Sequence, residues 1–106
     1  MDITTLLLSL GDNDAVCATD GAILRVKIPE TCWTDALREA VAEHKSVLIR
    51  FLTLAPGQTI PAETLLGWCD TYEERAAILE YGAGLSREDA ERQAWQMLRE
   101  TLHAAS

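Results

Sequence analysis

The chain has 106 residues, a length that fits one domain or a small domain with a helical extension. Its 17 acidic and 9 basic side chains give a formal net charge of −8. This charge argues against a free-standing nucleic-acid-binding protein, because such proteins usually present a basic surface. No apolar run reaches the roughly 18–20 residues that a membrane-spanning helix needs, so we expect no membrane association.

The three cysteines, Cys17, Cys32 and Cys69, are an odd number without a closely spaced pair. This pattern is typical of reduced thiols in a cytoplasmic protein rather than of a disulfide framework. The opening Met-Asp-Ile has no basic segment of the kind that begins a secretory signal. We therefore expect a cytoplasmic protein.

A first helix is expected from Ile3 to about Leu10, with Asp2 as its N-cap and Gly11 at its end. Its leucines form a broad apolar surface rather than a narrow stripe. Two interpretations follow, burial in the core and a contact between two copies, and the core is favoured. The leucines concerned are Leu6, Leu7 and Leu10.

Two short apolar-rich runs, 15–18 and 23–28, lie on either side of Asp20-Gly21. An Asp-Gly pair in this position predicts a β-hairpin with a two-residue turn. Pro29 then ends the second strand, because proline cannot donate to a strand ladder. Counting outward from the turn pairs Ala18 with Ile23, Cys17 with Leu24, Val16 with Arg25 and Ala15 with Val26.

Successive side chains of a strand point to opposite faces of a sheet. The face expected to contact the core carries Ala15, Cys17, Leu24, Val26 and Ile28. The face expected to be solvated carries Val16, Ala18, Ile23, Arg25 and Lys27.

A helical stripe follows the hairpin and is expected to cover it, since a two-stranded hairpin is marginally stable alone. Thr34 is a plausible N-cap, and Asp35 lies in the first turn, where negative charge suits the helix dipole. The stripe consists of Leu37, Val41, His44, Leu48 and Phe51.

Residues 1–54 resemble the TubC N-terminal docking domain, a small module at the ends of megasynthase subunits and on other bacterial proteins. The resemblance rests on the apolar opening helix, on the hairpin DGAILRVKIP (20–29), and on the Thr-headed helix that runs into EHKSVLIRFL (43–52). It implies a helix, a hairpin and two helices, the last two meeting near His44-Lys45. It also implies that the hairpin accepts a short linear partner segment as an added strand, helped by basic residues, and that the module tends to dimerise.

The segment 55–61 is linker-like, because it contains Pro56-Gly57 and Pro61. Apolar residues at steps of four and three then predict one helix over about 61–81. A break near 67–70 is the alternative, because Asp70 and Glu73 also fit a capping box. Gly82-Ala83-Gly84 ends this helix and Ser86 begins another, so residues 62–106 are expected to form a helical extension packed on or beside the first module.

The segment YEERAAILEYGAGLSREDAERQA (72–94) weakly resembles an element of phage and integrative-element proteins linked to replication.

The three tryptophans, Trp33, Trp68 and Trp95, have two interpretations. They either fasten the C-terminal helices to the first module or anchor a partner, and packing is favoured.

Catalytic and metal-binding patterns are not evident in the sequence. Nucleophilic catalysis needs a Cys or Ser beside a histidine with an orienting group, whereas His44 lies in the middle of the apolar stripe and His103 near the end of the sequence. No paired His/Cys spacing supports zinc. Residues 11–14 lack the ligand series of a calcium loop. The early turns of the last helix carry Glu88, Asp89 and Glu91, which would repel phosphates. We expect no enzyme, no metal, no cofactor and no direct nucleic-acid binding.

The expected fold is mostly α with one β-hairpin: an αββαα docking-domain-like core (1–54), a short linker (55–61) and a C-terminal helical hairpin (62–106). The expected function is a non-enzymatic protein–protein docking module that accepts a partner's short peptide segment on the edge of the hairpin. Arg25 and Lys27 would favour an acidic or C-terminal segment, although charged residues also protect sheet edges from pairing. The residues expected to bind the partner are Val16, Ala18, Ile23, Arg25 and Lys27.

Two other interpretations stay open. A small acidic protein of a mobile element would inhibit or adapt a basic, nucleic-acid-handling partner through Glu73, Glu74, Glu80, Glu88, Asp89 and Glu91. A homodimer would use the leucine-rich first helix as its interface.

Overall fold

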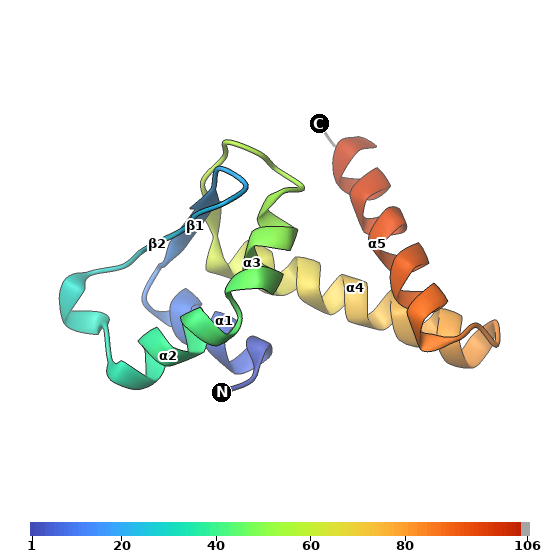
Figure 1. The fold of residues 1–106 in the computed structure, drawn as a ribbon, viewed down its shortest axis with the longest axis horizontal. Coiled ribbons are helices and arrows are strands. Elements are labelled where there is room, and N and C mark those ends of the chain that lie inside the picture. Colours follow the sequence, from blue (N-terminus) through green and yellow to red (C-terminus); the bar gives the residue numbers. More distant parts are fainter. Residues whose placement is uncertain (105–106) are drawn as a thin grey trace. The chain divides into compact units, whose positions relative to one another are not determined.

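Helices predominate in residues 1–104, the part of the chain that the computed structural model describes, and three short strands form an antiparallel sheet. This confirms the predicted mostly α fold with a β-hairpin. The first compact unit covers Met1–Leu66, and the second begins at Gly67, inside helix α4. Figure 1 shows the ribbon coloured along the sequence. In chain order the elements are α1 (Ile3–Asp12), β1 (Val16–Thr19), β2 (Leu24–Lys27), the 3-10 helix η1 (Glu30–Cys32), α2 (Asp35–Glu43), α3 (Lys45–Leu52), β3 (Ile60–Pro61), α4 (Ala62–Gly82) and α5 (Arg87–Ala104).

Helix α1 begins as expected, because Asp2 Oδ1 accepts a hydrogen bond from the Thr5 N–H at 2.7 Å. Its end differs from the prediction: Gly11 stays helical, and the helix continues to Asp12. The chain reverses at Asp14, whose φ is +53°, after Asn13 caps the helix. The Asn13-Asp14 pair thus ends the helix in place of Gly11, because Asn and Asp tolerate the left-handed region better than most residues.

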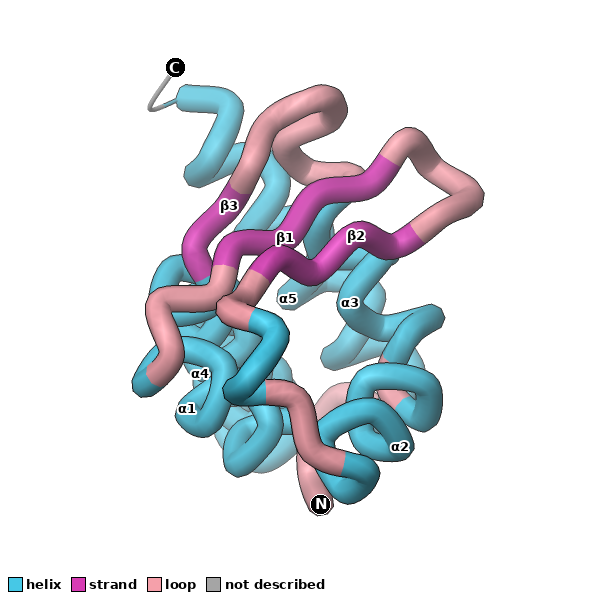
Figure 2. Tube along the Cα trace, turned by 90° about the vertical axis from the view of Figure 1, so that its left-hand side faces the viewer, coloured by secondary structure: helices cyan, strands magenta, loops and turns pink. Residues whose placement is uncertain are grey.

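The sheet has the strand order β2-β1-β3, with β1 in the middle (Figure 2). Helix α3 packs against β1 and β2. On β1 the buried residues are Cys17 and Thr19, whereas Val16 and Ala18 are half-buried. Burial raises the pKa of the Cys17 thiol to about 11, as expected for a cysteine that serves as a small core residue.

Strand β3 was not predicted, and it corrects the description of residues 55–61 as a linker. Ile60 pairs with Cys17 and Pro61 pairs with Val16, both antiparallel. The Ala62 N–H donates to the Ala15 carbonyl at 2.9 Å, which extends the contact by one residue. Pro61 tolerates this place because an edge strand needs no donor on its outer side, and α4 begins only at Ala62.

Helices α2 and α3 meet at His44, as the docking-domain resemblance implied. Thr34 Oγ1 accepts a hydrogen bond from the Leu37 N–H at 3.1 Å, so Thr34 is the predicted N-cap. His44 Nε2 lies 2.8 Å from the Met1 carbonyl oxygen, which ties the start of the chain to the junction of the two helices.

The second unit is a helical hairpin. Helix α4 runs unbroken from Ala62 to Gly82, so the capping-box interpretation at Asp70 is wrong. Gly84, with a φ of +72°, lies in the connection, and Ser86 Oγ accepts from the Asp89 N–H at 3.2 Å at the start of α5. Three alanines of these two helices are fully buried: Ala76, Ala90 and Ala94. Among the helices of residues 1–104, none has the length and apolar character needed to cross a bilayer.

Candidate functional site

The loop of the hairpin contains four residues rather than two. The Asp20 carboxylate accepts hydrogen bonds from the N–H groups of Ala22 and Ile23, both at 2.9 Å. Thr19 Oγ1 donates to the Ile23 carbonyl at 2.7 Å and accepts from the Gly21 N–H at 3.0 Å. These side chains close a wider loop in which Gly21 has a φ of +103°, so the predicted two-residue turn is wrong.

The wider loop shifts the pairing by two residues. Val16 pairs with Lys27, Cys17 with Val26, Ala18 with Arg25 and Thr19 with Leu24. A shift of two positions keeps every strand side chain on its predicted face, because the side-chain period of a strand is two. Ile23 is the exception, since it lies in the loop with 53% of its surface exposed and is not part of β2.

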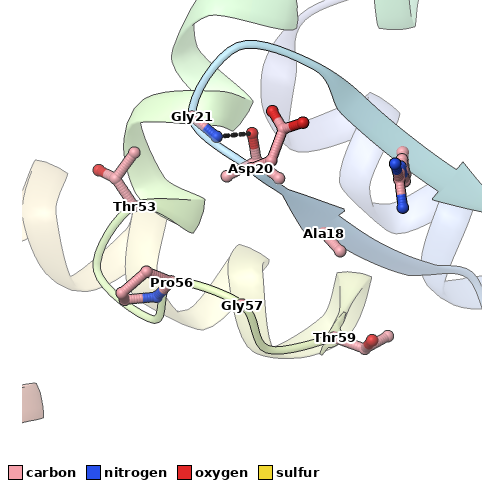
Figure 3. Close-up of a pocket in the computed structure, with 9 residues that line it drawn as sticks. Ala18, Asp20, Gly21, Thr53, Pro56, Gly57 and Thr59 are labelled. Atoms are coloured by element: carbon pink, nitrogen blue, oxygen red, sulfur yellow. Dashed lines mark hydrogen bonds between the residues drawn. The ribbon is translucent and has the colours of Figure 1, made fainter.

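The face that carries Val16, Ala18, Arg25 and Lys27 has a hollow at each end. The hollow beside the hairpin loop has a volume of about 390 Å³ and contains Ala18, Asp20 and Arg25 (Figure 3). Residues of the α3–β3 connection complete it: Thr53, Pro56, Gly57 and Thr59. The other hollow, of about 540 Å³, is lined by Asn13, Asp14, Val16, Lys27, Ile28 and Pro29. Each hollow therefore holds one cation and at least one carboxylate.

Strand β2 is an edge strand, whereas both edges of β1 are occupied. The opposite edge of the sheet is β3, which has only two residues and ends in Pro61. A proline cannot donate a ladder hydrogen bond, so β3 is a poor template for a further strand. Within residues 1–104, β2 is the edge that best suits strand addition.

The charges near this edge are of both signs. Arg25 and Lys27 are exposed, and neither forms an ion pair within the described residues. Hydrogen bonds from the Ala22 and Ile23 N–H groups lower the pKa of Asp20, so its carboxylate is ionised at neutral pH. Two exposed cations two residues apart on one strand face the same side and present a local positive surface on an acidic protein.

Other predicted site residues lie elsewhere in the fold. Leu6, Leu7 and Leu10 are fully buried, which places them in the core of the first unit. The tryptophans are all half-buried. Trp33 is stacked by Arg38, whose guanidinium carbon lies 5.9 Å from the ring centroid. Trp95 contacts Tyr72 edge-to-face at 6.3 Å between ring centroids.

The acidic residues of the second unit are largely engaged by arginines. Arg87 contacts Glu91 at 2.8 Å, Glu73 at 2.9 Å and Glu80 at 3.2 Å. Hydrogen bonds with these three carboxylates, led by Glu91, raise the pKa of Arg87. Arg92 contacts Asp89 at 3.1 Å and Glu88 at 3.8 Å. Glu74 is the member of the predicted acidic surface that no arginine contacts within residues 1–104.

No family model, curated protein or solved structure matches this chain. Among the described residues, no group of three or more His, Cys, Asp or Glu side chains is arranged to hold a metal ion.

The sequence did not reveal the residues of the α3–β3 connection that line the first hollow. Pro56-Gly57 predicts a turn, and Gly57 has the positive φ, +75°, typical of one. A turn signal says nothing about which distant segment the turn will lie beside. That proximity follows from the pairing of β3 with β1, which the two-residue strand Ile60–Pro61 is too short to signal.

Proposed function

We propose that the first unit, Met1–Leu66, is a non-enzymatic docking module that accepts a short extended peptide segment of a partner protein on the free edge of β2. The observation that carries the proposal is the position of β2 at the edge of a three-stranded sheet whose other edge is short and ends in proline. Strand addition suits such an edge, because backbone hydrogen bonds supply affinity and alternate side chains supply specificity.

The chemistry of the edge favours an acidic segment. Side chains of an added strand that point to the face of Arg25 and Lys27 would lie beside these two exposed cations. The half-buried Val16 and Ala18 on the neighbouring strand offer a small apolar surface next to them. The exposed loop residue Ile23 extends this surface beyond the strand.

The test uses charge reversal in the full chain. The variant Arg25→Glu with Lys27→Glu is expected to lose the partner that the wild type captures from an extract of its host, because two positive charges beside the bound strand become negative, a change of four units. Its melting temperature should stay close to that of the wild type, because both side chains are exposed. Amide NMR shifts of residues 24–27, recorded with the partner's own segment, should then change most.

The matched control is Lys45→Glu with Arg99→Glu, which changes the net charge equally at exposed positions outside the hairpin. We expect this control to keep the partner. Equal loss in both variants, or NMR shifts that leave residues 24–27 unchanged, would show that the edge is not the docking site.

The acidic surface of the second unit is a weaker basis for the function. Arg87 alone engages three of its carboxylates, and Arg92 contacts two more. Carboxylates that already form ion pairs with arginine attract a basic partner less strongly, because their charge is partly neutralised. Partner binding that weakens steeply with salt and is unchanged in the Arg25→Glu, Lys27→Glu variant would favour this alternative.

A further inference from the structure

A groove in the first unit lies between α1 and the first residues of α4, and it shares no lining residue with the two hollows beside the hairpin. It has a volume of about 280 Å³. This is below the range of about 300–1,000 Å³ typical of small-molecule sites. The α1–α4 groove, as we name it, is lined by Leu7, Leu8, Gly11, Asp12, Glu63 and Leu66.

The floor of the groove is apolar and reaches the surface. Leu7 is fully buried, Leu66 is half-buried, and Leu8 exposes 51% of its surface. The other leucines of this helix (Leu6, Leu7 and Leu10) are completely buried in the core. Leu8 is exposed, so packing of the core does not explain why an apolar residue lies at this position. There is room for a side chain at Gly11, since a Cβ there would meet nothing closer than the Glu63 backbone nitrogen, at 3.9 Å.

The charged side chains of the groove are both carboxylates. Asp12 and Glu63 are exposed, and neither forms an ion pair within residues 1–104. No lysine or arginine lines the groove. A second copy of this chain would bring the same two carboxylates to the contact, in a protein of net charge −8, so self-association through this groove is disfavoured.

We propose that the α1–α4 groove docks a cationic amphipathic helix of a partner protein. One apolar side chain of that helix would fill the hollow beside Leu8 and Leu66. Lysine or arginine within one helical turn of it would contact Asp12 and Glu63. This is the helix-in-groove mode of recognition, and it is independent of strand addition at β2.

The probe is a synthetic peptide of about 15 residues made of leucine and lysine, with the leucines at helical spacing. A second peptide of the same composition has its leucines distributed around the helix. In NMR titrations of the full chain, the amphipathic peptide should shift the amides of Leu8, Gly11 and Leu66. It should bind several-fold more tightly than the reordered peptide, because only the amphipathic peptide presents its leucines on one face of the helix, with its lysines beside them.

Variants separate the groove from general charge attraction. Leu8→Glu should weaken binding of the amphipathic peptide at least about tenfold, as expected for loss of a central apolar contact. Val47→Glu is the matched control, because it adds the same negative charge outside the groove. Val47 lies on α3 and exposes 42% of its surface. Gly11→Leu should also weaken binding, because its own side chain enters the groove, while better helix propensity supports the fold.

Three results would overturn the proposal: equal binding of the two peptides, equal effects of Leu8→Glu and Val47→Glu, or shifts that map to residues outside the groove. The Arg25→Glu, Lys27→Glu variant should bind the probe at least as well as the wild type. Failure at the groove would therefore leave the strand-edge function untouched, and failure at β2 would leave the groove untouched.

Discussion

Asp20 and Thr19 set the length of the hairpin loop with their side chains. The Asp-Gly pair is a correct signal for a turn, but the carboxylate binds two N–H groups beyond it and the hydroxyl closes the loop at Ile23. Short polar side chains compete in this way with the backbone pattern of a tight turn. The sequence does not show which of the two patterns wins, because both satisfy local donors.

The Asp20 carboxylate should stabilise the fold in a pH-dependent manner. Its pKa is lowered in the folded state, so its contribution is fully present above the unfolded pKa of about 3.9 and is lost as pH falls through the folded pKa. We expect Asp20→Asn, which keeps an acceptor but removes the charge, to lower the melting temperature at pH 7. The difference from the wild type should shrink at acidic pH.

Thermal melts followed by circular dichroism between about pH 3 and pH 7 would measure this difference. The control is Asp70→Asn, because the exposed Asp70 side chain accepts no backbone hydrogen bond within residues 1–104. A difference for Asp20→Asn that stays constant over the whole pH range would contradict the assigned role.

Among the elements, β3 decides how the sheet is used. It occupies the second edge of β1 and leaves β2 as the accessible one. It also brings residues 53–59 beside the hairpin loop to form the first hollow. A segment that looked like a linker is therefore part of the candidate site.

Ile60 should behave as a core residue rather than as part of a linker. It exposes only 7% of its surface, so Ile60→Ala is expected to lower the free energy of unfolding by about 2 kcal/mol or more. Gln58→Ala, an exposed position in the same segment, should change it by less than about 0.5 kcal/mol. Chemical denaturation of both variants provides the comparison, and similar values would show that β3 contributes nothing.

Arg87 contacts carboxylates of both helices of the α4–α5 hairpin, and we expect these contacts to support it. Arg87→Met keeps most of the stem but loses contacts to Glu73, Glu80 and Glu91, which leaves three carboxylates close together. We expect a lower melting temperature, and a smaller loss in about 1 M salt than in about 0.05 M salt, where repulsion is less screened.

Arg99→Met is the control for Arg87→Met, since Arg99 is exposed and forms no ion pair within residues 1–104. Its melting temperature should be nearly unchanged at either salt concentration. If both variants behave alike, the Arg87 contacts do not support the hairpin.

At the scale of the whole molecule, the two units carry equal charge. Residues 1–66 hold nine acidic and five basic side chains, and residues 67–106 hold eight and four, so each has a net charge of −4. The first unit has the sheet, the candidate edge and the α1–α4 groove. The second has a helical hairpin with arginine-bound carboxylates.

The boundary of the first unit makes a prediction about fragments. Ala62 and Leu65 are fully buried and belong to the first unit, although they lie beyond residue 54. A fragment of residues 1–66 should therefore melt cooperatively and at a higher temperature than one of residues 1–54, which also lacks β3. Equal melting of the two fragments would show that the module is complete at residue 54.

Local patterns in the sequence determined where α1, α2 and α5 begin, because the capping residues Asp2, Thr34 and Ser86 satisfy N–H groups only a few residues away. They also determined which faces of the hairpin strands are buried, since a period of two survives a shift of the pairing by two. The tertiary structure alone decided the pairing itself, the third strand and the two hollows. Those features depend on contacts between segments distant in the chain, such as Ile60 with Cys17, and neither segment carries a local signal of its partner.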